Sequence, residues 1–151
     1  MPISEHIRRL RKRVGTELLL VPSAAVLVRD ERGRVLLVRH VELGTWSLPG
    51  GAIEPDEPPQ VAAVREAYEE TGLLVESGKL LGVYGGPEFR ITYPNGDRVA
   101  YVPAVFEGRA VGGVERPDGI ETSEVRWFQP AELDGLPLTP IARTVLTRLL
   151  T

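Results

Sequence analysis

The sequence contains no cysteine, one methionine and few aromatic residues. The lack of cysteine excludes disulfide bonds, thiolate metal sites and cysteine nucleophiles. No apolar run approaches the roughly 18 residues that a membrane-spanning helix needs. The N-terminus also lacks the order of charged, apolar and small residues found in a secretory signal peptide. We therefore expect a cytoplasmic protein that does not span a membrane.

Strong net charge of either sign is also missing. The 151 residues carry a formal net charge of −3, which argues against a dedicated nucleic-acid-binding protein. The charge is uneven, because residues 1–17 carry five basic and two acidic side chains. Ile7, Leu10 and Val14 recur at helical spacing among these charges. We expect residues 1–17 to form a basic helix that packs its apolar stripe on the body, and residues 18–151 to form a single domain.

Three carboxylates carry the strongest chemical signal. Glu66, Glu69 and Glu70 stand at positions i, i+3 and i+4, which share one face of a helix. Like charges at i, i+4 destabilise a helix by about 0.2–0.5 kcal/mol per pair. A solvated surface is one interpretation of such a triplet, and a bound cation is the other. A hard divalent cation such as Mg²⁺ takes oxygen ligands and would neutralise this face.

The other side of the same helix is apolar, and the pattern predicts that this side is buried while the acidic side is presented. The residues of the apolar side are Val61, Val64, Ala67, Tyr68 and Thr71. Pro58 and Pro59 are suited to the start of the helix, where a missing N–H is harmless. Gly72 is suited to a left-handed C-terminal cap.

Residues at fixed offsets from the carboxylates complete a known pattern. Gly51 is followed after five residues by Glu57 and then by residues 65–73, with the sequence REAYEETGL. This segment resembles the Nudix box, the signature of hydrolases that cleave nucleoside diphosphates linked to another group. The resemblance implies a Nudix-type α/β/α sandwich with a mixed β-sheet. It also implies Mg²⁺ as cofactor, with Mn²⁺ as a substitute, and a small nucleotide as substrate.

The resemblance assigns roles to the box residues. The implied metal ligands are the side chains of Glu66, Glu69 and Glu70 and the backbone carbonyl of Gly50. Arg65 is expected to pair with Glu57 and so to hold the ligands in position. Gly50 and Gly51 provide a tight backbone path that can approach a metal or phosphate closely, and Gly51 is assigned to substrate binding. Many boxes have Ser or Thr where this chain has Pro58, so the usual hydroxyl cap of the helix is missing.

Residues outside the box complete the expected site. In similar enzymes a carboxylate from a later loop acts as metal ligand or general base; Glu121 is the candidate here and Glu124 the alternative. Either Glu70 or Glu121 accepts the proton of the attacking water. Arg39 is expected to contact substrate phosphate from a strand end. His40 is either a general base or an exposed loop residue.

The rest of the chain alternates between β-rich runs and turns. Residues 18–28 and 35–38 are expected to pair as two strands. Residues 89–93 and 99–106 flank Asn95-Gly96, which predicts a hairpin with a type I′ turn. Pro130 and Pro140 start two closing helices. Trp46 and the tyrosines of the hairpin are either packing residues or surfaces on which a base stacks.

The resemblance of the whole chain to stand-alone bacterial Nudix proteins favours ADP-ribose or a similar nucleoside diphosphate derivative. Two alternatives stay open: an RNA 5′-pyrophosphohydrolase, which only the basic N-terminal helix supports, and a nucleotide-binding module without catalysis. The lack of cysteine argues against the Nudix-like isopentenyl diphosphate isomerases. Nucleic acid and membranes are not expected as partners. We expect a homodimer, because dimerisation is common in the family.

Overall fold

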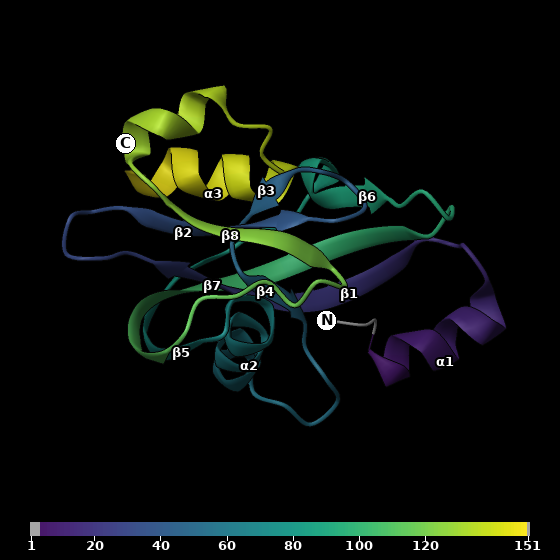
Figure 1. Ribbon diagram of the computed structural model, residues 1–151. Coiled ribbons are helices and arrows are strands. Elements are labelled where there is room, and N and C mark those ends of the chain that lie inside the picture. The colour runs from purple at the N-terminus through teal and green to yellow at the C-terminus, as the bar shows by residue number, and fades with distance from the viewer. Residues whose placement is uncertain (1–3, 151) are drawn as a thin grey trace.

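The computed structural model describes residues 4–150, and two sheets form its middle layer (Figure 1). The larger sheet has the order β4-β1-β7-β5, with β6 paired to β7. Its strands are β1 (Leu19–Val28), β4 (Gly50–Ala52), β5 (Leu73–Val83), β6 (Arg90–Thr92) and β7 (Arg98–Gly113). β1 and β7 are parallel, and the other pairs are antiparallel. The sheet is therefore mixed, as predicted.

The smaller sheet is antiparallel, with the order β3-β2-β8. Its strands are β2 (Val35–His40), β3 (Trp46–Ser47) and β8 (Thr122–Phe128). The helix α2 (Pro59–Thr71) covers one side of the strands, and α3 (Pro140–Leu150) covers the other (Figure 1). This arrangement confirms the predicted α/β/α sandwich. Of the two predicted closing helices, the first is the short 3₁₀ helix η2 (Pro130–Gly135); another 3₁₀ turn, η1 (Pro87–Phe89), precedes β6.

β1 connects the two halves of the core. Ala25 and Leu27 belong to the cluster that includes α3, whereas Ala24, Val26 and Val28 belong to the cluster that includes α2. Successive side chains of a strand point to opposite faces, and both faces of β1 are covered. A continuous apolar run is the expected sequence of such a strand.

Two local predictions are wrong. Residues 18–28 and 35–38 form strands that do not pair along their length, because β4 and β7 occupy both edges of β1; a single bridge, Arg29 to Val35, joins the two segments. The hairpin of β6 and β7 is present, but its turn is not type I′. That turn needs positive φ at both central residues, and Pro94 follows Tyr93, whose carbonyl accepts from Gly96 N–H. A proline ring fixes φ near −65°.

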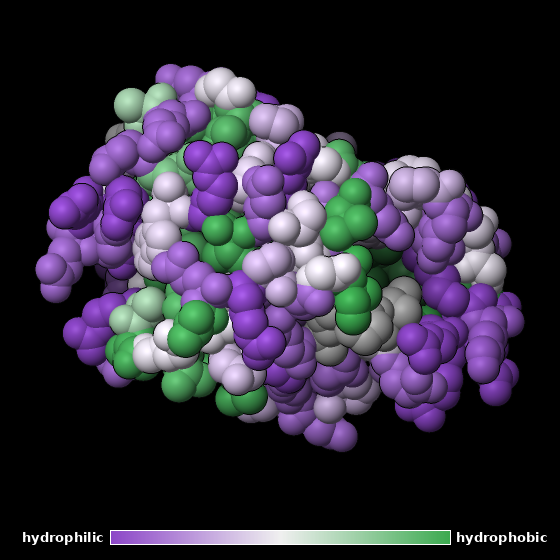
Figure 2. Space-filling view, in the orientation of Figure 1, coloured by the Kyte–Doolittle hydropathy of each residue, from purple (hydrophilic) through white to green (hydrophobic). Residues whose placement is uncertain are grey.

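The N-terminal helix α1 (Glu5–Val14) lies at one end of the molecule, beside the β6–β7 hairpin (Figure 1). Its predicted apolar stripe, Ile7, Leu10 and Val14, is half-buried. Hydrophilic residues dominate the surface over α1 (Figure 2). Ser4 caps the helix by accepting a hydrogen bond from the backbone N–H of Ile7 at 3.1 Å.

Candidate active site

The helix α2 carries the predicted acidic cluster and packs against β1, β4 and β5. It begins at Pro59, and Pro58 at the N-cap makes no side-chain hydrogen bond. It ends at Gly72, whose φ of 77° is left-handed. Both ends agree with the sequence prediction, including the missing hydroxyl cap.

The buried face of α2 differs from the prediction. Its buried residues are Ala62, Ala63, Glu66, Ala67, Glu70 and Thr71, whereas Val61 and Tyr68 are 54% and 45% exposed. The alanines are small, so the helix lies close to the sheet, and two of the carboxylates lie on this packed face. Glu66 is 4% exposed and Glu70 is 1% exposed. Ala67 and Thr71 are therefore buried as predicted, but Glu66 and Glu70 share the buried face with them, and Val61 and Tyr68 are partly in solvent.

Two glycines of β4 make room for these carboxylates. Gly50 N–H donates a 2.7 Å hydrogen bond to Glu70 Oε1. A methyl group at Gly51 would lie 2.6 Å from the carboxyl carbon of Glu66, and one at Gly50 would lie 2.5 Å from the carbonyl oxygen of Ala24. Both glycines are therefore required for space, which confirms the close backbone path predicted from the sequence.

Arg65 joins the acidic residues into one network. Its guanidinium donates to both carboxylate oxygens of Glu57, at 2.7 and 2.9 Å. Its Nη1 donates to Glu66 at 3.0 Å and to Glu69 at 3.2 Å, and its Nη2 donates to the carbonyl of Ala52 at 3.2 Å. The predicted pair between Arg65 and Glu57 is present. The hydrogen bonds to Glu57 raise the pKa of Arg65 above its ordinary value, so the guanidinium of Arg65 stays charged.

Ionisation of the buried carboxyl groups is opposed by their surroundings. Burial raises the pKa of Glu66 to about 7, although the charge of Arg65 acts in the opposite direction. Burial and the negative charge of Glu66 raise the pKa of Glu70 well above its usual value, against the hydrogen bond from Gly50. Burial and Glu66 also raise the pKa of Glu121 to about 7. A cation beside these groups would relieve the penalty.

These pKa values predict how stability depends on pH in the absence of metal. Glu66 and Glu121 have folded pKa values of about 7, above the roughly 4.3 of an unfolded glutamate. Their contribution to stability is complete below pH 4 and is lost as the pH rises through 7. We expect the Tm of protein in EDTA to fall by about 5 °C or more between pH 5 and pH 8, and 10 mM Mg²⁺ to reduce that fall. A Tm that is flat or rising over this range would contradict the burial of charge described above.

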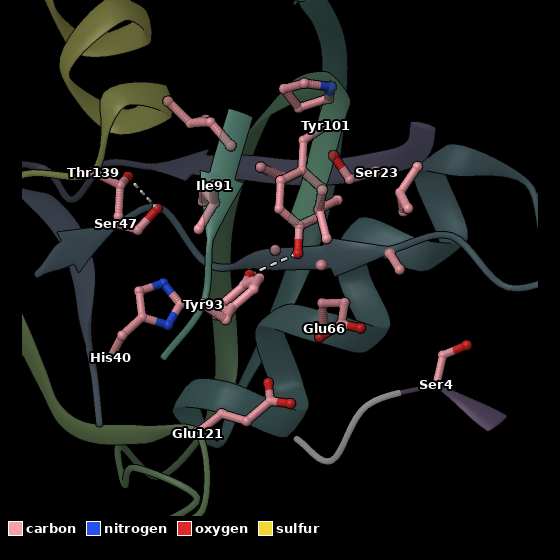
Figure 3. A pocket seen from close by; sticks show the side chains of 18 of the residues that line it. Ser4, Ser23, His40, Ser47, Glu66, Ile91, Tyr93, Tyr101, Glu121 and Thr139 are labelled. Carbon is pink, nitrogen blue, oxygen red and sulfur yellow. Dashed lines mark hydrogen bonds between the residues drawn. The ribbon is translucent and has the colours of Figure 1, made fainter. Parts of the chain in front are cut away.

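A cavity of about 470 Å³ opens onto this cluster. Glu66 and Glu70 lie in its wall, and Glu121 reaches it from the loop before β8. In Figure 3, Glu121 lies between His40 and Glu66, and its carbonyl accepts a hydrogen bond from the backbone N–H of Val41, the residue after His40. His40 is the last residue of β2 and lines the cavity; burial lowers the pKa of its imidazole, so the ring is neutral near pH 7. The cavity therefore brings together three carboxylates and one neutral imidazole.

Four of the residues considered from the sequence are not among those that line the cavity: Arg39, Glu69, Trp46 and Glu124. Arg39 Nη1 lies 3.9 Å from Glu124 Oε1, and both side chains are 44% exposed. Geometry therefore favours Glu121 over Glu124 as the later-loop carboxylate, and Arg39 is not positioned to contact a ligand in the cavity. Glu69 lies beside the cluster, where Arg65 binds it. Trp46 is a core residue, with its ring centroid 4.9 Å from that of Phe128.

Comparison with known proteins identifies the group. The family model described as the NUDIX domain matches residues 19–149. The chain belongs to the Nudix hydrolase family. It is 41% identical over 113 residues to a MutT-like protein of Streptomyces ambofaciens, a match covering 75% of this chain and 66% of that protein.

Two further relatives carry more specific names. The chain is 36% identical over 111 residues to a putative 8-oxo-dGTP diphosphatase of Bacillus subtilis, with 74% of this chain and 68% of that protein covered. It is 32% identical over 138 residues to an ADP-ribose pyrophosphatase of Methanocaldococcus jannaschii, with 89% and 76% covered. Among solved structures, a MutT Nudix hydrolase from Burkholderia pseudomallei superposes with a TM-score of 0.72 at 29% identity, covering 87% of this chain and 98% of that one.

Membership confirms the enzyme class predicted from the box. Nudix hydrolases generally use divalent cations and act on small nucleotide substrates. The described part of the chain contains no helix long and apolar enough to cross a membrane.

The residues of this Nudix site are chemically suited to a hard divalent cation, because its prospective ligands are carboxylates. In residues 4–150, no three acidic or histidine side chains converge tightly enough to hold a metal as they stand. Arg65 binds the Glu66 and Glu69 carboxylates directly. A cation bound at these two carboxylates would therefore share them with Arg65.

Other residues that line the cavity belong to no recognisable sequence motif. Tyr93 and Tyr101 line it from the hairpin, and Ser4, Ile7 and Arg11 line it from α1. The amphipathic pattern predicted α1, and aromatic alternation predicted the hairpin, but neither pattern indicates that the two elements enclose the same space as Glu66. That arrangement depends on tertiary contacts far apart in the sequence.

Proposed function

We propose that this Nudix hydrolase cleaves the diphosphate linkage of a nucleoside diphosphate derivative, with Mg²⁺ bound at Glu66, Glu69, Glu70 and the carbonyl of Gly50. The observation that carries the proposal is the burial of Glu66 and Glu70 side by side in the wall of the cavity, where burial opposes the ionisation of both. A pair of buried acids destabilises the fold at neutral pH unless a cation accompanies it. The site is therefore suited to a metal–diphosphate complex.

Each residue of the cluster has a separable role. Glu66, Glu69 and Glu70 hold the cation, which when bound neutralises phosphate charge and lowers the pKa of an attacking water. Arg65 and Glu57 keep these carboxylates in position. Glu121 accepts the proton of the water, since it reaches the cavity near Glu66 from the loop before β8 and its pKa of about 7 suits a general base.

ADP-ribose or a similar nucleoside diphosphate derivative is the favoured substrate. The relative from Methanocaldococcus jannaschii, which is matched over 89% of this chain, is named an ADP-ribose pyrophosphatase. The Bacillus subtilis relative is named a putative 8-oxo-dGTP diphosphatase, so oxidised nucleoside triphosphates form the second substrate class to test. The exposed basic residues of α1 lie beside the cavity, which keeps triphosphorylated RNA in the comparison.

A hydrolysis panel tests the proposal. Wild-type protein with Mg²⁺ is assayed against ADP-ribose, nucleotide sugars, dinucleoside polyphosphates, NADH, 8-oxo-dGTP and triphosphorylated RNA. We expect the highest kcat/KM for ADP-ribose and no turnover in EDTA. Highest activity on RNA, with a steep salt dependence that disappears when residues 1–17 are removed, would replace the proposal. Ligand binding without any turnover would favour a binding module.

Gly51→Ala is expected to lower kcat/KM for the best substrate of the panel by about 10²-fold, because displacing a reacting geometry by about 1 Å has this effect. The added methyl group would lie 2.6 Å from the Glu66 carboxyl carbon and must displace it. Gly135→Ala is the matched control, since a methyl group there meets nothing within 4 Å. Equal activities of the two variants would show that the close approach of Gly51 to Glu66 is irrelevant to catalysis.

A further inference from the structure

Two tyrosines face the cavity from the hairpin. Tyr93 follows β6 and Tyr101 lies in β7, and their hydroxyl oxygens are 2.7 Å apart. Figure 3 shows the two hydroxyls meeting over the middle of the cavity, above Glu66, with Ser23 beside Tyr101. Among the described residues, each tyrosine hydroxyl hydrogen-bonds only to the other. The pair is therefore placed to contact a ligand whose phosphates lie at the acidic cluster.

The hydrogen-bonding capacity of the pair is specific. One hydroxyl donates to the other, which leaves one O–H proton and several oxygen lone pairs for a third group. Burial raises the pKa of both Tyr93 and Tyr101 above the ordinary value, so both remain neutral. A neutral donor–acceptor pair suits a sugar hydroxyl or a base edge, each of which both donates and accepts.

The helix α1 lines the cavity through Ile7 and Arg11, and Arg11 holds the helix there. Arg11 donates to the carbonyls of Gly15 (3.1 Å), Glu17 (2.6 Å) and Arg98 (2.8 Å). Its Nε lies 3.7 Å from Asp97 Oδ2. One side chain thus connects the end of α1, the segment before β1 and the start of β7.

Charge limits what this part of the cavity can bind. The described acidic residues of the whole cavity wall are Glu42, Glu66, Glu70, Asp97 and Glu121, of which Glu66, Glu70 and Glu121 belong to the acidic cluster. Arg11 is the only lysine or arginine among the described lining residues, and its guanidinium already donates to three carbonyls. A second phosphate group bound beside the tyrosines would need a cation, and Arg11, the one described arginine or lysine of the cavity wall, already faces the Asp97 carboxylate at 3.7 Å. An uncharged group would not need one.

We propose that Tyr93 and Tyr101, enclosed by α1 through Arg11, form a specificity subsite for the uncharged sugar or base of the substrate. Tyr93 and Tyr101 contact that group directly, and Arg11 is a positioning residue. The inference rests on the proposed function, because it assumes that the phosphates lie at the acidic cluster.

The test measures separately how the enzyme binds the uncharged part and the charged part of the substrate. KM and kcat are measured for ADP-ribose, and the inhibition constant is measured for inorganic pyrophosphate, which carries only the charged part. Tyr101→Phe and Tyr93→Phe are each expected to raise KM about fivefold, the effect of one lost hydrogen bond to a neutral group. We expect kcat and the pyrophosphate inhibition constant to stay within twofold of wild type. Tyr68→Phe, on an exposed tyrosine of α2, is the matched control.

Arg11→Ala tests the positioning role. It is expected to raise KM about tenfold with kcat retained, because detachment of α1 removes a wall of the subsite but leaves the cluster intact. Arg9→Ala, which removes an exposed arginine of the same helix, should leave both constants unchanged. Rescue by Arg11→Lys is expected to be partial, since an ammonium cannot form the same fork of hydrogen bonds.

Failure of this inference is distinguishable from failure of the proposed function. If wild type hydrolyses ADP-ribose with Mg²⁺ and both Tyr→Phe variants keep its KM, the subsite is overturned and the function stands. If the panel selects another nucleotide, the same comparison with pyrophosphate is made with that nucleotide. If no diphosphate is hydrolysed, the function fails, and thermal shifts by ADP-ribose in wild type and Tyr101→Phe still decide the subsite: equal shifts, or none in either, overturn it.

Discussion

Glu70→Gln is expected to lower kcat by about 10³-fold, the scale of losing one preorganised electrostatic group, and to raise the Tm of the metal-free protein. The loss follows because Glu70 is a proposed ligand of the cation. The gain follows because burial opposes the ionisation of Glu70. A glutamine has nearly the same shape, and its amide oxygen can still accept the 2.7 Å hydrogen bond from Gly50 N–H. Activity and stability should therefore change in opposite directions.

The opposite signs exclude unfolding as the reason for lost activity. Activity is measured with Mg²⁺ at pH 8, and Tm is measured in EDTA at the same pH. Glu76→Gln is the matched control, since Glu76 is 66% exposed and paired with an exposed arginine. A Glu70→Gln variant that retains most of its kcat, or that melts well below wild type, would remove Glu70 from the proposed role.

Arg65→Lys is expected to lower kcat/KM by about 10- to 100-fold, the usual effect of losing a residue that orients metal ligands. Lysine keeps the positive charge but cannot donate to both Glu57 oxygens, Glu66, Glu69 and the carbonyl of Ala52 together. A lysine is used because alanine would leave buried carboxylates unpaired, which costs about 3–5 kcal/mol.

Comparison of Arg65→Lys with Glu57→Gln and with the double variant isolates the contribution of the Arg65–Glu57 pair to activity. If Arg65 acts through Glu57, the two losses should be far from additive, as expected for residues in direct contact. Arg109→Lys is the control, because Arg109 forms an exposed ion pair with Glu76. Full activity of Arg65→Lys would mean that charge alone is needed and that the five-bond network of Arg65 is incidental.

The parts of the fold that follow from local pattern could be predicted from the sequence. The ends of α2 follow from Pro59 and Gly72, and the burial of β1 follows from its continuous apolar run. The partner of β1 could not be predicted, because adjacent runs usually pair and here β7, some 80 residues later, takes that edge. The buried side of α2 was predicted only in part, since Ala67 and Thr71 are buried as expected but Val61 and Tyr68 are exposed. The small side chains of Ala63 and Ala67 indicate that α2 lies close to a neighbouring element. The residues that these alanines contact lie in strands elsewhere in the sequence.

The residues of the candidate site also fall into those that local spacing predicts and those that it does not. Arg65, Glu66 and Glu70 fall within two turns of one helix, so their spacing alone places them together. Arg39 was expected at the site because a guanidinium at a strand end is suited to phosphate contacts, yet its side chain lies beside Glu124. Tyr93 reaches the cavity from the hairpin and Arg11 reaches it from α1. Contacts between elements so far apart in the sequence cannot be predicted from local residue spacing.

A Mn²⁺ titration, followed by the electron paramagnetic resonance signal of the free ion, tests most directly whether the buried carboxylates form a cation site. Wild-type protein is expected to remove free Mn²⁺ from solution, with Mg²⁺ competing, and Glu76→Gln should behave identically. Glu70→Gln is expected to bind at least about tenfold more weakly. Binding by Glu70→Gln as tight as that of wild type, or no Mn²⁺ binding by wild type even with ADP-ribose present, would contradict the proposed site.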